Sequence, residues 1–473
     1  MLRTKGLRRA DWTRDTSFFY INIRGNCTPG SRLESSCRPD ESILNPPMRK
    51  TFLTLTALFV ATLASAQVDS DKQIDLRAKT SNNTSASASF HGMYNGNAQL
   101  GQVSKLPVRS LLYPGATTKI YVRVVSFFDQ NKKHADVGYL SDDRPQVRHQ
   151  VEDMISRGID GAVVDWYGTQ RPEHAQVPVV FKEEAEDHSP FTFAISYDRG
   201  ALKKCEDTHC DVTRLLIQDL NYAYDHFENS QAYLHENGRP VIFFFDVIDP
   251  SIDWNQVRAS VKGNPLLINR NAHSFKTPES DGAFGWLDRN TSPDLPYLDD
   301  FYKKYFEAKR SRPTLIFGSV YKGYDDRAAS WGRGTVLPQN CGQTWLNTFD
   351  KINRYFSTSN QLEALQIVTW NDYEEGTEIE TGIDDCVQLQ PTLSGDKLHW
   401  DISGNENAVD HFAIYASPDG HKLTELGEVP EKTHDFKLNA AAVTSGQYRL
   451  FVEAVGKSSI LNKMSPALQW QKN

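Results

Sequence analysis

The stretch ALQIVTWNDYEEGTEIE, residues 364–380, joins a short apolar run to a dense group of acids. The run 364–369 is rich in β-branched residues and lacks helical spacing, which predicts a buried strand. The strand ends where Asp372, Glu374 and Glu375 begin. Parallel α/β sheets and barrels place their active sites at the C-terminal ends of their strands. Asp372 and Glu375 are therefore the first candidates for catalysis.

The neighbours of these acids distinguish a site from a solvated loop. An Asp-x-x-Glu pair is weak by itself in a chain with 24% charged residues, because it also fits a helix N-cap at Asn371 or Asp372. Trp370 and Tyr373, however, offer flat apolar faces on which sugar rings stack. Gly376 permits a tight turn. Two carboxyl groups, one protonated and one ionised, are the minimum for cleaving a glycosidic bond.

Eight apolar runs alternate with amphipathic stretches. The runs lie at residues 119–127, 161–166, 191–197, 240–246, 265–269, 282–286, 314–320 and 364–369, with helical patterns at 144–157, 212–235 and 298–310. This alternation predicts a parallel sheet, and eight units within about 260 residues fit an α/β (β/α)8 TIM barrel. A doubly wound open sheet is the alternative. It is disfavoured because no Gly-rich phosphate fingerprint follows any strand.

Two segments resemble known glycoside hydrolases. The stretch 370–380 resembles the Asn-acid-aromatic-x-Glu-Gly-Thr-x-Ile-Glu motif of the family 99 endo-α-mannosidases, and its opening is similar to that of the family 71 endo-α-1,3-glucanases (mutanases). RGIDGAVVDWYG, residues 157–168, is similar to the second helix-strand unit of both families. The resemblance implies a (β/α)8 barrel with Asp372 and Glu375 as catalytic carboxylates, Glu375 being the general acid. Asp372 replaces the mannosidase Glu, so sugar and linkage stay open.

Polar and aromatic residues follow nearly every predicted strand. A single acid at a strand end fits a helix N-cap as well as a ligand contact, but the recurrence from strand to strand predicts a substrate-binding wall. Hydroxyl-rich substrates need both hydrogen-bond partners and stacking faces. The residues that we expect to bind substrate are Asp165, Trp166, Tyr167, Tyr197, Asp246, Trp286, Tyr321, Trp370, Asn371 and Tyr373.

Charge and composition limit the partners. A net charge of -8 argues against a nucleic-acid binder, which needs clustered Lys and Arg. An aromatic content of 11% suits carbohydrate stacking, although buried core explains most of it. We expect a polysaccharide or oligosaccharide substrate, no cofactor and no metal. A zinc site at Cys205, His209 and Cys210 fits poorly, because no Cys-x-x-Cys partner appears.

The N-terminal region carries an export signal. MRKTFLTLTALFVATLASA, residues 48–66, predicts a secretory signal peptide, so residues 1–47 are expected to be a mistaken upstream extension. A membrane anchor is the alternative, but the apolar run 52–63 is short for a span. Residues 67–107, rich in Ser, Asn and Ala, predict a flexible leader. We therefore expect a secreted or periplasmic protein without stable membrane insertion.

Four cysteines follow the predicted cleavage site. Their even number in an exported chain favours two disulfides, and we expect Cys205 to pair with Cys210 and Cys341 with Cys386. The second bond would tie the chain just beyond the acidic stretch to a segment that precedes it. The predicted barrel spans residues 108–386.

Residues 387–473 change character. Alternating runs separated by turn signals such as Pro-Asp-Gly predict an all-β sandwich. Trp400, Tyr415 and the run 448–455 resemble the fibronectin type III family. Such modules act as spacers or partners of a barrel, with carbohydrate binding as the alternative.

Together these features predict a secreted, endo-acting glycoside hydrolase that cleaves α-linked polysaccharide of the α-1,3-glucan or α-mannan type. The alternative is a non-catalytic glycan-binding protein on the same barrel. The presence of both acids favours the enzyme.

Overall fold

The computed structural model describes most of the chain beyond residue 102. The described residues are 103–130, 134–171, 175–287, 292, 294–439 and 443–473, with the backbone of Gln73–Asp75. They belong to one compact unit, Val68–Asn473. The predicted upstream extension, the signal peptide and most of the leader lie outside the described residues.

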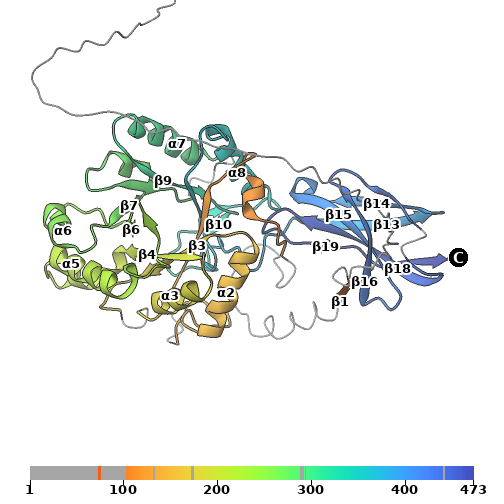
Figure 1. The fold of residues 1–473 in the computed structure, drawn as a ribbon, viewed down its shortest axis with the longest axis horizontal. Coiled ribbons are helices and arrows are strands. Elements are labelled where there is room, and N and C mark those ends of the chain that lie inside the picture. Colours follow the sequence, from red (N-terminus) through yellow and green to blue (C-terminus); the bar gives the residue numbers. More distant parts are fainter. Residues whose placement is uncertain are drawn as a thin grey trace, which may run out of the picture. The chain divides into compact units, whose positions relative to one another are not determined.

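Eight parallel strands close into a barrel (Figure 1). They are β2 (Lys119–Val124), β3 (Gly161–Trp166), β4 (Thr192–Asp198), β6 (Arg239–Phe245), β7 (Leu266–Arg270), β8 (Gly282–Phe284), β9 (Leu315–Val320) and β12 (Ala364–Ile367). Their order is β4-β3-β2-β12-β9-β8-β7-β6, and a pairing between β4 and β6 closes the ring. Each predicted run supplies one strand, so the TIM barrel prediction is confirmed.

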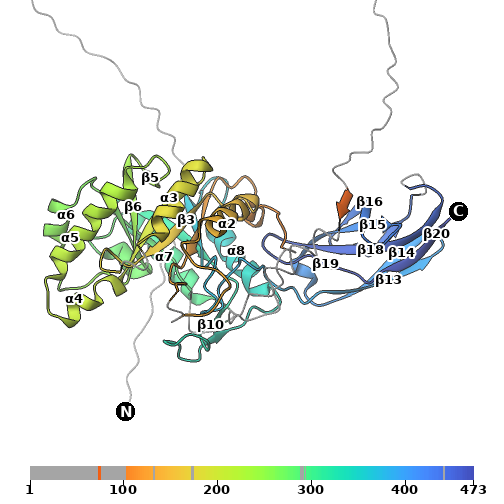
Figure 2. The same cartoon turned by 90° about the horizontal axis from the view of Figure 1, so that it is seen from below.

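Helices cover the outer face of the barrel (Figure 2). They are α2 (Arg144–Ser156), α3 (Val177–Asp187), α4 (Lys203–Asp207), α5 (Val212–Ala223), α6 (Trp254–Ser260), α7 (Pro296–Lys309) and α8 (Gln343–Tyr355). The strands read as apolar runs because helices bury one face and the barrel interior buries the other. Among the described residues, no helix is both long enough and apolar enough to cross a bilayer.

The predicted helix at residues 212–235 ends too late. The α-helix stops at Ala223, continues as a π-helical turn over Tyr224–Glu228, and gives way to strand β5 (His235–Glu236), which pairs with the start of β6. Asn237 and Gly238 join these strands with positive φ angles of 52° and 74°. An Asn-Gly pair favours such a two-residue hairpin turn, and this local signal overrides the helical pattern.

Glu228, at the end of the π-helical turn, gives a first prediction. Its side chain is buried, neither carboxyl oxygen has a hydrogen-bond partner among the described residues, and burial raises its pKa to about 8. Because the unfolded chain ionises this group near 4.5, Glu228→Gln should increase the free energy of unfolding by about 3 kcal/mol at pH 7. At pH 4 both states keep the proton, and the gain should disappear. Urea denaturation at the two pH values measures this, and an equal change at both would contradict it.

Two antiparallel sheets follow the barrel, as predicted. One contains β13 (Gln388–Ser394), β14 (Lys397–Ser403) and β17 (Asp435–Lys437). The other contains β1 (Gln73–Asp75), β16 (Lys422–Pro430), β15 (Val409–Ser417), β18 (Gly446–Gly456), β19 (Lys463–Met464) and β20 (Leu468–Lys472). Trp400, Phe412 and Leu450 belong to their shared apolar core. The backbone of β1 lies within the predicted leader. Independent folding of residues 387–473 and their fibronectin type III character stay predictions.

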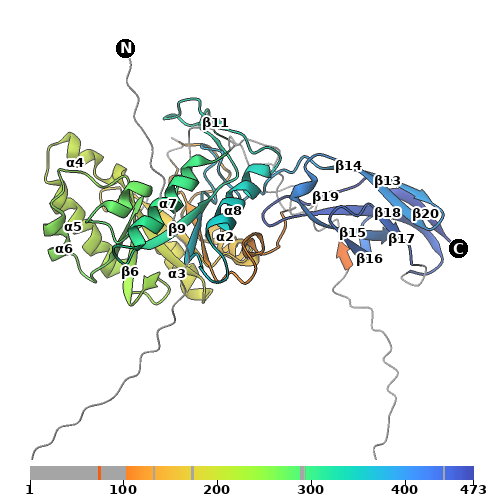
Figure 3. The ribbon, with the colours of Figure 1, turned by 90° about the horizontal axis from the view of Figure 1, so that it is seen from above.

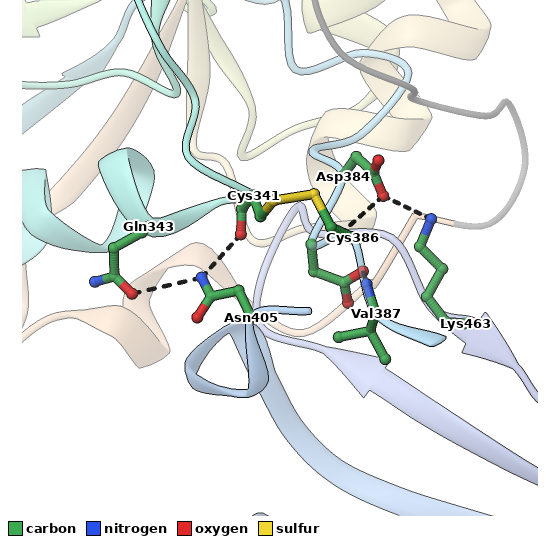
Figure 4. The surroundings of a disulfide bond; sticks show 8 residues. Cys341, Gln343, Asp384, Cys386, Val387, Asn405 and Lys463 are labelled. Carbon is green, nitrogen blue, oxygen red and sulfur yellow. Dashed lines mark hydrogen bonds and ion pairs between the residues drawn. A yellow bond between two sulfur atoms is a disulfide. The ribbon is translucent and has the colours of Figure 1, made fainter. Parts of the chain in front are cut away.

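The two expected disulfides, Cys205–Cys210 and Cys341–Cys386, are present. Figure 4 shows the second bond, which joins the segment before α8 to the segment before β13. Asn405 donates to the carbonyl of Cys341 at 2.8 Å, and Lys463 forms an ion pair with Asp384 at 2.6 Å. The disulfide therefore closes a covalent loop that contains the acidic stretch. The Asn405 hydrogen bond and the Lys463 ion pair also hold the two segments that this disulfide joins.

Candidate active site

The acidic stretch folds back on itself where β12 ends. The amide of Asp372 donates to Oγ1 of Thr369 at 3.0 Å, and the Asp372 carboxylate accepts from the amide of Glu375 at 3.0 Å. The amide of Thr377 then donates to the Asp372 carbonyl at 3.1 Å. Asp372 thus caps a turn, which agrees with the alternative interpretation of this residue as a cap. The same turn presents Glu375 at the C-terminal mouth of the barrel.

Asp372 and Glu375 have different environments. Asp372 is buried, and its pKa is raised well above the usual value by burial and then by the charge of Glu375. Glu375 is half-buried, and its Oε1 accepts a hydrogen bond from Nε1 of Trp331 at 3.2 Å. The Tyr324 hydroxyl lies 3.5 Å from the same oxygen, but its one proton has the shorter contact with Asp326, at 3.0 Å. Burial therefore favours the neutral form of Asp372, while the indole donor favours the ionised form of Glu375.

Asp165 adds a third acid to the mouth. It is buried at the end of β3 and forms an ion pair with Arg123 of β2. Burial raises the pKa of Asp165 to about 7, although the Arg123 charge opposes this shift. The Arg123 guanidinium also lies 5.1 Å from the ring centre of Phe245 and 5.4 Å from that of Trp286. Arg123 therefore links the acids to aromatic rings of the barrel interior.

Tyr167 and Asp198 complete this acidic mouth. Burial raises the pKa of Tyr167 well above its usual value, and the charges of Asp198, Asp165 and Asp372 contribute to this shift. Burial also raises the pKa of Asp198, whose carboxylate accepts from the amide of Gly200 at 2.6 Å. Four strand ends thus bring their polar residues within electrostatic reach of one another.

Asp246 lies apart from the acid pair, in a polar pocket of about 360 Å³ beyond β6 and β7. Its exposed carboxylate forms a two-point ion pair with Arg270. The lining residues are Arg199, Asp246, Val247, Ile248, Asn269, Arg270, His273 and Ser274. Positive and negative groups alternate around this pocket, which suits a neutral ligand with many hydroxyl groups.

Four of the predicted substrate contacts have no exposed surface: Trp166, Tyr197, Tyr321 and Trp370. Trp166 packs against Tyr197 and against Tyr222 of α5, on the outer side of the barrel. The Tyr197 hydroxyl donates to Asp219 of α5 at 2.7 Å. Trp166 and Tyr197 therefore pack between the strands and α5, and none of the four side chains presents a surface to solvent in this structure.

Asn371 and Tyr373 are also buried and hold the backbone in place. The Asn371 amide group accepts from the nitrogen of Val125 at 2.9 Å and donates to its oxygen at 3.2 Å. The Tyr373 hydroxyl donates to Glu380 at 2.8 Å. The Asn371 contacts connect the acidic stretch to the end of β2, and the Tyr373 contact braces the stretch internally.

Glu374 turns away from Glu375 toward the loop after β2. Its carboxylate contacts Nδ1 of His134 at 2.9 Å and accepts from the amide of Ala135 at 2.9 Å. Sequence reasoning does not place His134, Arg123 or Trp331 near the acids, because none of them belongs to a motif. Among the described residues, no three His, Cys, Asp or Glu side chains are grouped as metal ligands would be.

Comparisons with known proteins reveal only distant similarity. No protein-family model and no curated protein matches the chain. The GH99 endo-α-mannosidase from Bacteroides thetaiotaomicron is similar at 16% identity and a TM-score of 0.45, over 56% of this chain and 87% of that one. The pectate lyase PelI from Erwinia chrysanthemi is similar at 20% identity and a TM-score of 0.15, over 18% of this chain and 27% of that one.

Proposed function

We propose that this protein is an exported glycoside hydrolase that cleaves α-linked polysaccharide with Asp372 and Glu375. The observation that carries the proposal is their contrast within one turn at the mouth of the barrel. Burial raises the pKa of Asp372, whereas Glu375 is half-buried and accepts a hydrogen bond from the Trp331 indole. Carboxyl groups whose environments separate their protonation states are the apparatus of glycosidic cleavage.

In the proposed reaction, Glu375 gives its proton to the glycosidic oxygen as the bond to the anomeric carbon breaks. Water attacks that carbon, and ionised Asp372 takes the proton that water releases. The leaving sugar carries away the proton of Glu375, so the charges balance. This route inverts the configuration. A pair held too closely for a water molecule would instead support a retaining route.

Substrate binding must favour the ionised form of Asp372. The mechanism requires Asp372 as an ionised base, whereas burial raises its pKa and favours its neutral form. A sugar hydroxyl that donates to Asp372 would lower the pKa of Asp372, because hydrogen bonds to a carboxylate favour its charged form. A glycosidic oxygen beside Glu375 would favour the protonated acid. The substrate itself thereby sets the active protonation state.

The proposed substrate contacts are the predicted residues that face the mouth or the polar pocket. These are Asp165, Tyr167, Asp246 and Trp286. Carboxylates accept hydrogen bonds from sugar hydroxyls, and the aromatic rings supply stacking faces. The motif resemblance favours α-1,3-glucan or α-mannan. The signal sequence and the two disulfides support export.

The test is release of reducing sugar by the secreted protein from α-1,3-glucan, α-mannan and other α-glucans. Release from one polymer, lost in both Asp372→Asn and Glu375→Gln, would establish the hydrolase and its substrate class. Failure on every polymer would contradict the proposal.

A glycan-binding protein without catalysis is the second candidate. It is favoured by the burial of Asp372, which raises the pKa of the residue that the reaction needs in its ionised form. Retardation of the protein in a polysaccharide gel, with no sugar released, would support this candidate.

A further inference from the structure

A short hairpin stands beside the acid pair and carries an exposed tryptophan. Strands β10 (Tyr324–Asp325) and β11 (Val336–Leu337) pair antiparallel, and the hairpin projects from the barrel (Figure 3). Trp331 lies in the loop between them. Its side chain is 44% exposed, and only Ile155 is a comparably exposed large apolar residue in the described part of the chain.

Hydrogen bonds and close packing hold the hairpin loop in one conformation. The Asp326 carboxylate accepts from the amide of Thr335 at 2.6 Å and from the Tyr324 hydroxyl at 3.0 Å. Gly332 packs so closely that a Cβ atom there would lie 1.7 Å from the carbonyl oxygen of Asp326. The amide of Asp325 also donates to the carbonyl of Glu375 at 2.8 Å. The loop is therefore tied both to itself and to the acidic stretch.

Two other rings pack against the indole ring of Trp331. Its centre lies 6.0 Å from that of Phe127 and 5.7 Å from that of His134, and these two rings stack at 4.3 Å. His134 is itself held by Glu374, the neighbour of the proposed acid. A preorganised aromatic ring loses little conformational freedom when a ligand stacks on it. The exposed indole therefore offers a stacking face that is already held in position.

The polar edge of the same indole faces the proposed acid. Nε1 of Trp331 donates to Oε1 of Glu375 at 3.2 Å. The sugar that receives a proton from Glu375 must lie next to this carboxyl group, and hence next to the indole. We infer that Trp331 is the stacking platform for the sugar ring on the leaving-group side and that its N–H positions Glu375. This inference rests on the proposed hydrolase function and adds a subsite to it.

The test compares Trp331→Ala, Trp331→Phe and, as a control on the same hairpin, Arg327→Ala. Arg327 is exposed and pairs only with nearby Asp325 among the described contacts, so its loss should change activity little. Each variant is assayed on the cleaved polymer and on the α-glycosyl fluoride of its repeating sugar. The fluoride has no sugar on the leaving-group side.

We expect Trp331→Ala to raise KM for the polymer about tenfold, the size of a lost aromatic contact, and to leave the fluoride reaction within about threefold. Trp331→Phe keeps the ring but removes the N–H donor from Glu375. Since that donor favours the ionised carboxylate, its loss favours the protonated form of Glu375 and should shift the limb of the kcat/KM profile that this residue sets to higher pH.

Equal losses on polymer and fluoride, or no loss on either, would overturn the inference while leaving the hydrolase intact. Failure of the wild-type protein to cleave any glycan would overturn the proposed function, and the inference with it. Unfolding midpoints of the three variants separate these outcomes from a misfolded hairpin, and Trp331→Phe, which keeps the ring, tests the N–H contact even if Trp331→Ala unfolds.

Discussion

Glu375→Gln is expected to lower kcat on the polysaccharide substrate by about 10³-fold, the middle of the usual range for removing a general acid. The amide keeps the shape of the side chain but cannot deliver a proton to the glycosidic oxygen. Reducing-sugar assays at the pH optimum measure the loss. The free energy of unfolding should change by less than about 1 kcal/mol, because Glu375 is half-buried and its partners are neutral donors.

Glu374→Gln is the matched control for this prediction. Glu374 precedes Glu375 in the sequence, but its side chain turns toward His134 and Ala135, away from the proposed reaction. We expect it to keep activity within about tenfold, since it acts only through the loop after β2. Comparable losses in the two variants would mean that the stretch, rather than Glu375, is what activity requires.

Lys322→Met should destabilise the protein by about 3–5 kcal/mol at pH 8, because it leaves Glu378 buried without its partner. Nζ of Lys322 lies 2.6 Å from the Glu378 carboxylate, and both side chains are fully buried. Burial already raises the pKa of Glu378 to about 7, while Lys322 opposes that shift. Without the lysine the pKa rises further, so the destabilisation should grow as pH rises above the usual value near 4.5 and be smaller at pH 5.

The double variant Lys322→Met/Glu378→Gln is the control. Removing both charges should recover most of the lost stability, because replacing a buried pair with neutral groups is often tolerated. Urea denaturation of the wild type and the two variants at pH 5 and pH 8 completes the comparison. If Lys322→Met were as stable as the wild type at pH 8, Lys322 and Glu378 would not form a buried ion pair.

The strands were predictable because parallel barrel strands are buried on both faces and stay apolar throughout. The eight runs therefore marked the eight strands of the barrel directly. The end of the 212–235 helix was not predicted, since its helical pattern runs on toward a hairpin set by two residues, Asn237 and Gly238. The Asn-Gly turn sets the end of this helix, and hydrophobic periodicity alone does not predict it.

The site was predicted in part, and strand alternation explains the rest. Successive side chains of a strand point to opposite faces. In β3, Asp165 therefore faces Arg123 inside the barrel, while Trp166 packs outward against Tyr222. Taking both residues as substrate contacts ignored this alternation. Trp331 escaped prediction for another reason, because a hairpin loop has no period from which its orientation can be read.

The most direct test of the proposed acid/base pair compares Glu375→Gln and Asp372→Asn on the polymer and on the α-glycosyl fluoride. Fluoride leaves without protonation, so a variant that lacks only the acid should still cleave it. The account predicts that Glu375→Gln loses the polymer reaction but keeps fluoride cleavage within about tenfold, whereas Asp372→Asn loses both. The reverse pattern, with Asp372→Asn retaining fluoride cleavage, would contradict the assignment and make Asp372 the acid.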